Sequence, residues 1–381
     1  MNKRKLFGIV ACAVLIKFFL FAFLVFHAPQ NRFQNDSADY IESAGVISSQ
    51  ETFARLNADG SLRFDLHRPP GYSFFLAILR GAMKLPFNAV IFIQVLLTLL
   101  AAWITYKAAY LIDPAVAFLS AVIVLYDPPV SIYSLIILSE TLFFLLLACF
   151  MFVFVRYLKD RRIYLVAAAA LLLATATYTR AISYYLGMVV AVFIAYANLR
   201  LKTAGRAVTH VLVFLVVFYG LLGIWQSRNY RLTGVKTFAS VIQGNPEAFG
   251  LCGNLSRSGG LENDGAKPVV YYSKIASRCL LSLLTRPGQF KYFKSSILSA
   301  VGKIFAYPWM IFWILGFIIG MIRVKGNIYY QFMLLVCAYF IAASIGGAGL
   351  LVGERFRVPM VPFIAVLSAY GWSLIYAKKR G

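Results

Sequence analysis

The sequence predicts an all-α polytopic membrane protein, and both its composition and its hydropathy pattern point to this fold class. Hydrophobic residues make up 61% of the 381 residues and charged residues only 13%, against roughly 25% charged in soluble domains. About ten apolar stretches follow one another along the chain, each near the ~20 residues that cross the hydrocarbon core as a helix. We therefore expect a single membrane-embedded domain over residues 1–381 with about ten transmembrane helices.

The predicted spans run, in order, over residues 6–27, 88–109, 114–133, 139–157, 163–179, 181–199, 207–226, 299–322, 329–351 and 357–377. The first follows Lys3, Arg4 and Lys5 as a signal peptide does, but it is long enough to span and no small-residue cleavage site follows His27. We interpret it as a retained helix. Lys17 interrupts it at a position that allows contact with other helices or with a polar cavity.

The basic residues predict the orientation of these spans. Short loops rich in Lys and Arg fall on the same side at every return of the chain, at residues 107, 156–162, 200–206, 323–325 and 378–380. Such loops stay in the cytoplasm, so we expect both termini on the cytoplasmic side of the inner membrane. The net charge of +23 then reflects topology rather than nucleic-acid binding, since no base-stacking motif accompanies it.

Two long polar segments, 28–87 and 227–298, are expected on the outer side, each with short juxtamembrane helices. In the first, Asp36, Tyr40 and Ala44 recur at helical spacing, so a short helix is expected there. The alternative is that Asp36 serves only as the N-cap of this helix. The run Arg-Pro-Pro-Gly-Tyr at 68–72 predicts a turn into a second helix.

The polar residues that flank the spans all fall on this outer face. They are Asp36, Asp39, His67, Arg68, Tyr72, Asp127, Glu140, Arg180, Arg228, Glu354, Arg355 and Arg357. Charged groups at the edge of hydrocarbon usually are paired or functional. Arginines beside carboxylates suit an anionic phosphate headgroup, with a carboxylate as general base. The alternative is that each arginine extends to the headgroups and each acid is a solvated cap.

Several short motifs in this set resemble those of the C-type membrane glycosyltransferases, especially the bacterial relatives of protein O-mannosyltransferases and of aminoarabinose lipid A transferases. The motifs are Asn35-Asp36-Ser37-Ala38-Asp39-Tyr40, His67-Arg68-Pro69-Pro70-Gly71-Tyr72, Ser139-Glu140-Thr141-Leu142-Phe143, Thr179-Arg180, Arg228-Asn229-Tyr230 and Glu354-Arg355-Phe356-Arg357. They occur in the family's order and cover approximately residues 30–372.

The resemblance implies inverting transfer of a sugar from a polyprenyl-phosphate-linked donor, on the outer face, to a glycan, lipid or protein acceptor. It assigns Asp36 as the base, with Asp39 as its nearest substitute, because the acidic pair here is Asp-x-x-Asp rather than Asp-Glu. It also implies that Arg180, Arg228 and Arg355 neutralise the leaving phosphate. Asp127 and Glu140 would orient partners or hold a divalent cation, and His67, Arg68, Tyr72 and Glu354 would complete the substrate site.

Relatives often carry more spans or a C-terminal extramembrane domain, so acceptor recognition is expected in residues 227–298 or in a partner protein. Two other classes of function stay open at this point. One is a transporter or flippase of a lipid-linked sugar or solute, which also binds phosphate by arginine. It usually places its charges near the bilayer midplane and shows related halves, which this sequence does not. The other is a non-catalytic assembly subunit.

The five cysteines show no metal-binding spacing. Cys252 and Cys279 both lie in the second outer segment. An oxidising exterior would permit a disulfide between them.

Overall fold

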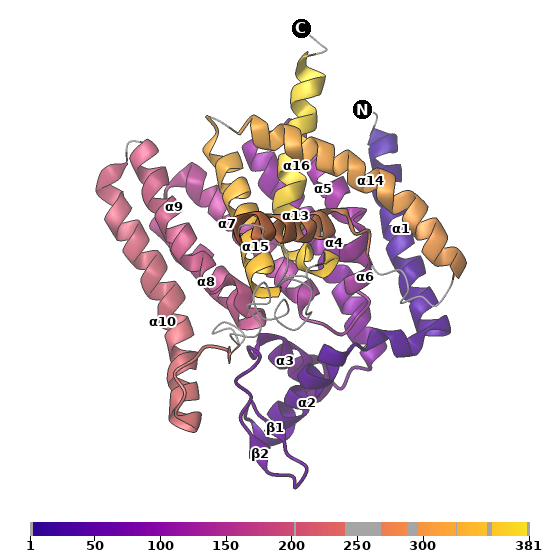
Figure 1. The fold of residues 1–381 in the computed structure, drawn as a ribbon, viewed down its shortest axis with the longest axis vertical. Coiled ribbons are helices and arrows are strands. Elements are labelled where there is room, and N and C mark those ends of the chain that lie inside the picture. Colours follow the sequence, from indigo (N-terminus) through magenta and orange to yellow (C-terminus); the bar gives the residue numbers. More distant parts are fainter. Residues whose placement is uncertain are drawn as a thin grey trace.

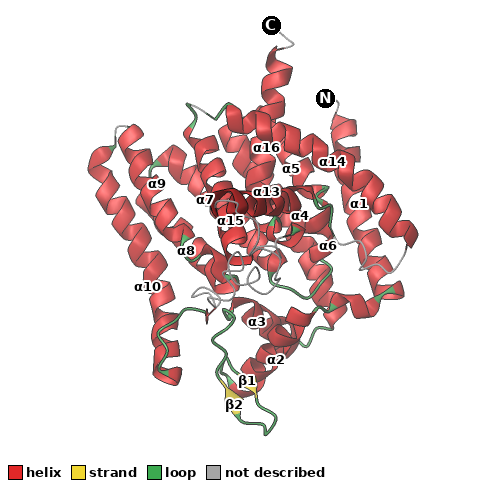
Figure 2. Ribbon diagram, viewed as in Figure 1, coloured by secondary structure: helices red, strands yellow, loops and turns green. Residues whose placement is uncertain are grey.

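A computed structural model of the chain describes residues 3–201, 203–240, 268–288, 296–324, 326–348 and 353–378. Among these residues, eight helices are long and apolar enough to cross a membrane, and α5 and α8 are shorter apolar helices. The larger elements are α1 (Lys3–His27), α2 (Asn35–Gln50), β1 (Arg55–Leu56), β2 (Leu62–Arg63), α3 (Gly71–Leu76), α4 (Phe87–Ile112), α5 (Pro114–Leu125), α6 (Pro128–Tyr133), α7 (Glu140–Asp160), α8 (Ile163–Thr179), α9 (Leu186–Arg200), α10 (Ala207–Thr233), α13 (Pro268–Thr285), α14 (Ser296–Ile322), α15 (Ile328–Ala348) and α16 (Val361–Lys378). The all-helical polytopic fold class is confirmed (Figure 2).

Short helical turns join these elements. They are η1 (Pro29–Arg32), η2 (Ala77–Ala82), η3 (Ala181–Ser183), η4 (Ala204–Arg206), η7 (Glu354–Phe356) and η8 (Val358–Met360). The turns η7 and η8 precede α16, so the span expected over 357–377 begins with the 3-10 turn η8 rather than with regular helix.

The third predicted span, 114–133, is wrong as one continuous helix. The structure ends α5 at Leu125 and begins α6 at Pro128. Two prolines in succession remove backbone donors, and the residue before a proline is driven out of the helical region. Asp127 has φ −66° and ψ 120°, and its side chain caps α6 by accepting from the Val130 amide at 2.9 Å.

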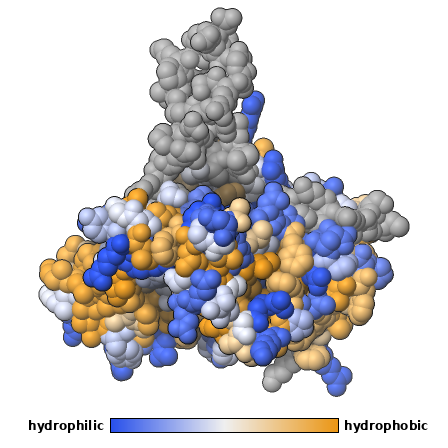
Figure 3. Space-filling view, turned by 90° about the horizontal axis from the view of Figure 1, so that it is seen from below, coloured by the Kyte–Doolittle hydropathy of each residue, from blue (hydrophilic) through white to orange (hydrophobic). Residues whose placement is uncertain are grey.

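The two chain ends lie at one end of the molecule, and α2, α3 and the small hairpin lie at the other (Figure 1). The long helices run between these two ends. Figure 3 views the end that carries α2 and α3, where hydrophilic patches alternate with hydrophobic ones. This arrangement places the first predicted outer segment across the bundle from the termini.

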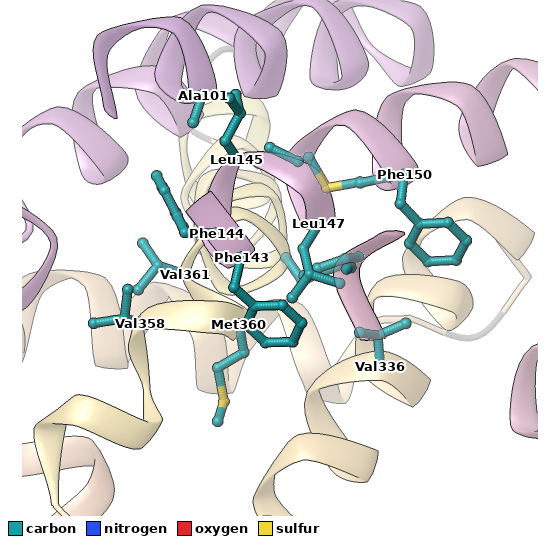
Figure 4. Close-up of a cluster of buried hydrophobic side chains, with 14 of the residues drawn as sticks. Ala101, Phe143, Phe144, Leu145, Leu147, Phe150, Val336, Val358, Met360 and Val361 are labelled. Atoms are coloured by element: carbon teal, nitrogen blue, oxygen red, sulfur yellow. The ribbon is translucent and has the colours of Figure 1, made fainter. Parts of the chain in front are cut away.

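The helix α7 forms the centre of the bundle. It packs against α4 and α8 and touches the start of α16. Its side chains Phe143 and Phe150 are completely buried and pack against Phe340 and Phe332 of α15, and Figure 4 shows Phe143 beside Met360. Because α7 begins at Glu140, this packing fixes the position of that acid inside the molecule.

The helices α14 and α16 touch through their backbones. A Cβ atom added at Gly371 would lie 2.0 Å from the Gly316 carbonyl oxygen, and one added at Gly320 would lie 2.2 Å from the Leu367 carbonyl oxygen. Small residues of this kind allow close helix approach in membranes. The middle of α16 is therefore held close to α14.

At the far end of the molecule, α2 confirms the helix that was expected around residues 36–44, although it continues to Gln50. Gln34 rather than Asp36 caps it, since the Gln34 side chain and Ser37 exchange hydrogen bonds with each other's backbone amides. The hairpin that pairs Arg55 with Arg63 was not expected from the sequence.

Candidate active site

The first turn of α2 is tied to the chain that leads into α7. The Ser37 hydroxyl donates to the Ile137 carbonyl at 2.7 Å, and the hydroxyls of Tyr40 and Ser139 are 3.1 Å apart. Ser139 immediately precedes Glu140. These contacts bring the acidic motif of residues 35–40 to the start of α7.

Asp36 lies in that first turn and is bound by two arginines. Arg68 Nη2 contacts one carboxylate oxygen at 2.9 Å, and Arg355 Nη1 contacts the other at 2.7 Å. Burial raises the pKa of Asp36, but the charges and hydrogen bonds of Arg355 and Arg68 outweigh it and leave the pKa below its ordinary value. Asp36 is therefore ionised at neutral pH.

Glu140 is completely buried and also serves two arginines. Its Oε1 atom accepts from Arg180 Nη1 at 2.5 Å and from the Nε atom of Arg355. Its Oε2 atom is buried and has no hydrogen-bond partner among the described residues. A carboxylate in the first turn of a helix is favoured by the helix dipole, which supports an ionised Glu140.

Arg355 thus bridges the two acids, and the pairing continues outward from Asp36. Arg68 donates from Nε to Asp39 at 2.9 Å, and Arg55 contacts Asp39 at 2.7 Å. The result is a row of alternating charges that we call the charge row, made of Arg180, Glu140, Arg355, Asp36, Arg68, Asp39 and Arg55. The structure brings together six of the residues named from the sequence, and Arg55 joins them at the Asp39 end of the row.

Arg228 lies apart from this row. Its guanidinium donates to the Phe53 carbonyl at 2.6 Å and stands 4.5 Å from the centre of the Trp225 ring. Among the described residues no carboxylate lies within ion-pair distance of it. Arg180 and Arg355 both bind Glu140. Arg228 lies in α10 and instead contacts Phe53 in the segment that follows α2.

Asp127 and Glu354 belong to a second, buried group. Asp127 Oδ2 lies 3.9 Å from Arg357 Nη2, and Tyr133 donates from its hydroxyl to Glu354 at 3.4 Å. Lys17, the charge within the first span, donates from Nζ to the Ser131 hydroxyl at 2.8 Å. Among the described residues, no ion pair joins this group to Asp36.

Tyr72 and His67 occupy different surroundings. Tyr72 is completely buried, and its hydroxyl donates to Gln94 at 2.6 Å, so it supports α3 rather than facing solvent. The preceding Gly71 explains the Pro-Gly-Tyr motif, because a Cβ atom there would lie 2.7 Å from the Tyr178 carbonyl oxygen of α8. His67 is exposed, with its Nδ1 atom 3.4 Å from the Ser240 hydroxyl.

Sequence reasoning missed Arg55 and Ser139. Arg55 binds Asp39 and Glu42 and so anchors the hairpin to α2, and Ser139 accepts from Arg180 Nη1 at 3.2 Å. The signal for Arg55 was its place in a segment rich in acids, which is too general to single out one arginine. Ser139 was visible only as part of the motif around Glu140.

No group of three or more His, Cys, Asp or Glu side chains suited to a metal ion occurs in the part of the chain that the structure describes. In the charge row the oxygens of Asp36 are taken by arginines, so the arrangement does not fit a divalent cation and we derive no step through one. The predicted disulfide depends on Cys252, which lies outside the described residues.

No protein-family model matches the sequence, and no curated protein matches it. Solved structures do match in three dimensions. The Archaeoglobus fulgidus oligosaccharyltransferase in complex with zinc and sulfate superposes with a TM-score of 0.59 at 13% identity, over 97% of this chain and 49% of that one. The same organism's oligosaccharyltransferase AglB with an inhibitory peptide and a dolichol-phosphate gives 0.55 at 12% identity, over 99% and 51%.

ArnT from Cupriavidus metallidurans in its apo state gives a TM-score of 0.52 at 13% identity, over 90% of this chain and 56% of that one. This chain spans about half the length of the structures it matches. At these identities the likeness establishes the fold. The chain has the fold of polytopic membrane glycosyltransferases, as the resemblance in its motifs implied.

Proposed function

We propose that the protein transfers a sugar from a polyprenyl-phosphate-linked donor to an acceptor at the outer face of the inner membrane. The observation that carries this proposal is the charge row, in which Arg355 joins Asp36 to the buried Glu140 within a fold shared with lipid-linked sugar transferases. AglB was solved with a dolichol-phosphate. That ligand class has the anionic phosphate that arginines recognise by paired hydrogen bonds.

The proposed reaction is a single displacement with inversion at the anomeric carbon. A nucleophilic O–H or N–H of the acceptor forms the new bond to this carbon while the bond to the phosphate oxygen breaks. The acceptor proton passes to Asp36, and the electron pair leaves with the polyprenyl phosphate. Arg180 and Arg355 then neutralise the charge that develops on the phosphate, and Arg228, which has no acid partner among the described residues, supplies a further positive charge beside the same segment.

Competition for Arg355 links phosphate binding to proton transfer in this scheme. A phosphate that draws Arg355 toward itself leaves Asp36 with Arg68 as its remaining arginine partner. Loss of one cation raises the pKa of a carboxylate, so Asp36 becomes a stronger base when the donor is in place. Asp39 is paired with Arg55 and Arg68, whereas Arg355 pairs with Asp36 and Glu140, which supports Asp36 rather than Asp39 as the base.

The test is mass spectrometry of glycans and lipids from cells that carry the wild type, Asp36→Asn or Asp39→Asn at equal membrane levels. Asp59→Asn serves as the matched control, because Asp59 lies at the exposed tip of the hairpin and accepts only from Ser61. We expect one sugar increment to disappear with Asp36→Asn and to persist with Asp59→Asn. Loss with Asp39→Asn alone moves the base by three residues, and an unchanged profile in both variants overturns the proposal in favour of transport or an assembly role.

A further inference from the structure

Arg357 forms an unusual contact with the carboxyl end of α13. The side chain is completely buried, and its Nη1 atom donates to the carbonyls of Leu283, Leu284 and Arg286 at 2.9, 2.8 and 3.2 Å. The last carbonyls of a helix have no partners within the helix, and they carry the negative end of its dipole. A guanidinium that donates to three of them at once caps the helix.

The other edge of the same guanidinium faces Asp127 and Trp313 in the interior of the protein. Nη2 lies 3.9 Å from Asp127 Oδ2, and the guanidinium carbon lies 5.3 Å from the centre of the Trp313 ring in α14. Asp127 is itself fixed as the cap of α6. Arg357 therefore connects α13 to α6 and α14, and an unpaired charge at this depth is costly.

Arg357 and Arg355 belong to one short piece of backbone. Arg355 lies in η7 and Arg357 links η7 to η8, and the Arg357 amide donates to the Glu354 carbonyl at 3.1 Å. The Glu354 side chain accepts from the Tyr133 hydroxyl of α6. The residues on both sides of Arg355 are thus tied to buried partners, while Arg355 itself extends to Asp36 and Glu140.

We propose that Arg357 is a positioning residue, which by capping α13 holds the 354–357 turn so that Arg355 lies on Asp36 and Glu140. The docking of α13 then sets how closely Asp36 is paired. The inference deepens the proposed function and rests on it for the meaning of Asp36 as the base. The placement of Arg355 against Asp36 and Glu140 can be tested without any substrate.

The test measures how readily the Asp36 carboxylate reacts with a chemical label, which depends on its pairing with arginines. The charged groups around Asp36 are Arg68 from the first outer segment and Arg355 from η7, with Asp39 and Glu140 as the further partners of these two arginines. A carboxylate held by two arginines reacts slowly with a water-soluble carbodiimide and an amine. Labelling of the purified full-length protein in lipid nanodiscs, followed by peptide mass spectrometry, measures the reactivity of each acid.

We expect Arg357→Gln to raise the labelling of Asp36 roughly two- to fivefold, the change that loss of one partly exposed ion pair gives. Labelling of Asp39, which is held by Arg55 and Arg68, stays unchanged. In the Arg355→Gln background, the further change Arg357→Gln adds nothing, because its effect passes through Arg355. Arg156→Gln, which breaks an exposed pair at the opposite end of α7, leaves Asp36 as in the wild type.

Two results overturn the proposal: unchanged Asp36 labelling in a folded Arg357→Gln variant, or an equal increase in the presence and absence of Arg355. If Arg357→Gln does not yield monodisperse protein, Arg357→Lys keeps the charge opposite Asp127 but loses the planar fork that reaches three carbonyls. It should give an intermediate increase, and no increase would equally contradict the proposal. Since no sugar donor is used, this outcome is independent of whether sugar transfer is found.

Discussion

At the scale of single residues, Glu140 has the most demanding surroundings of the acids in the charge row. Its side chain is 0% exposed, while Arg180 and Arg355 retain 18% and 27% exposure. One carboxylate oxygen thus compensates two guanidinium groups at the edge of the membrane. Removing its charge leaves Arg180 without an acid partner among the described residues and Arg355 with Asp36 alone.

We expect Glu140→Gln to lower the free energy of unfolding by about 3 kcal/mol, the lower end of the cost of breaking a buried pair, since the arginines keep some contact with solvent. Thermal unfolding of the purified protein in one detergent measures the change. Asp160→Asn is the matched control on the same helix, where the pair with Arg156 is exposed and worth at most about 0.5 kcal/mol. Equal shifts in the two variants would contradict this account.

The residue types of the site could be predicted from the sequence, but their pairing could not. Asp36, Glu140 and Arg355 stand out because charged groups beside apolar spans need a reason to be there. Which arginine binds which acid depends on side-chain directions set by the packing of α2 and α7, and two of the partners are separated by 215 residues. For the same reason the separate position of Arg228 and the contribution of Arg55 had no specific sequence signal.

At the scale of elements, the seam between α14 and α16 depends on the absence of side chains. Gly371→Ala places a methyl group 2.0 Å from a backbone oxygen of Gly316, and backbone atoms cannot rotate away as a side chain can. We expect a loss of about 1–3 kcal/mol, typical of overpacking, seen as a lower thermal midpoint. Gly223→Ala in α10, where nothing lies within 4 Å of the added atom, should be neutral or slightly stabilising. A neutral Gly371→Ala would refute the close seam.

Hydropathy predicted most of the elements because a spanning helix must be long and apolar whatever it packs against. It failed at 114–133, where the break before Pro128 was hidden by apolar residues on both sides. It also gave no sign of the hairpin at residues 55–63, whose strands are two residues long and are held by Arg55 rather than by a hydrophobic pattern.

At the scale of the whole molecule, the predicted orientation of the chain in the membrane can be tested by labelling. Both ends of the chain lie opposite α2 and the hairpin (Figure 1), so one reagent can distinguish the two faces. In a variant whose native cysteines are replaced by Ser, Asp59→Cys in the hairpin should react with a membrane-impermeant maleimide in intact cells. Lys159→Cys at the far end of α7 should react only after the membrane is permeabilised. The reverse pattern would invert the topology.

The burial of Glu140 has a consequence for how the protein responds to salt. At physiological ionic strength, mobile ions screen charges over about 8 Å of water, but Glu140 is closed to solvent and its two arginines touch it directly. Counter-ions have no room to enter between these groups. The pairing of Glu140 with Arg180 and Arg355 should persist in concentrated salt, whereas the exposed Arg156–Asp160 pair at the opposite end of α7 weakens, so added salt acts on one end of this helix and spares the other.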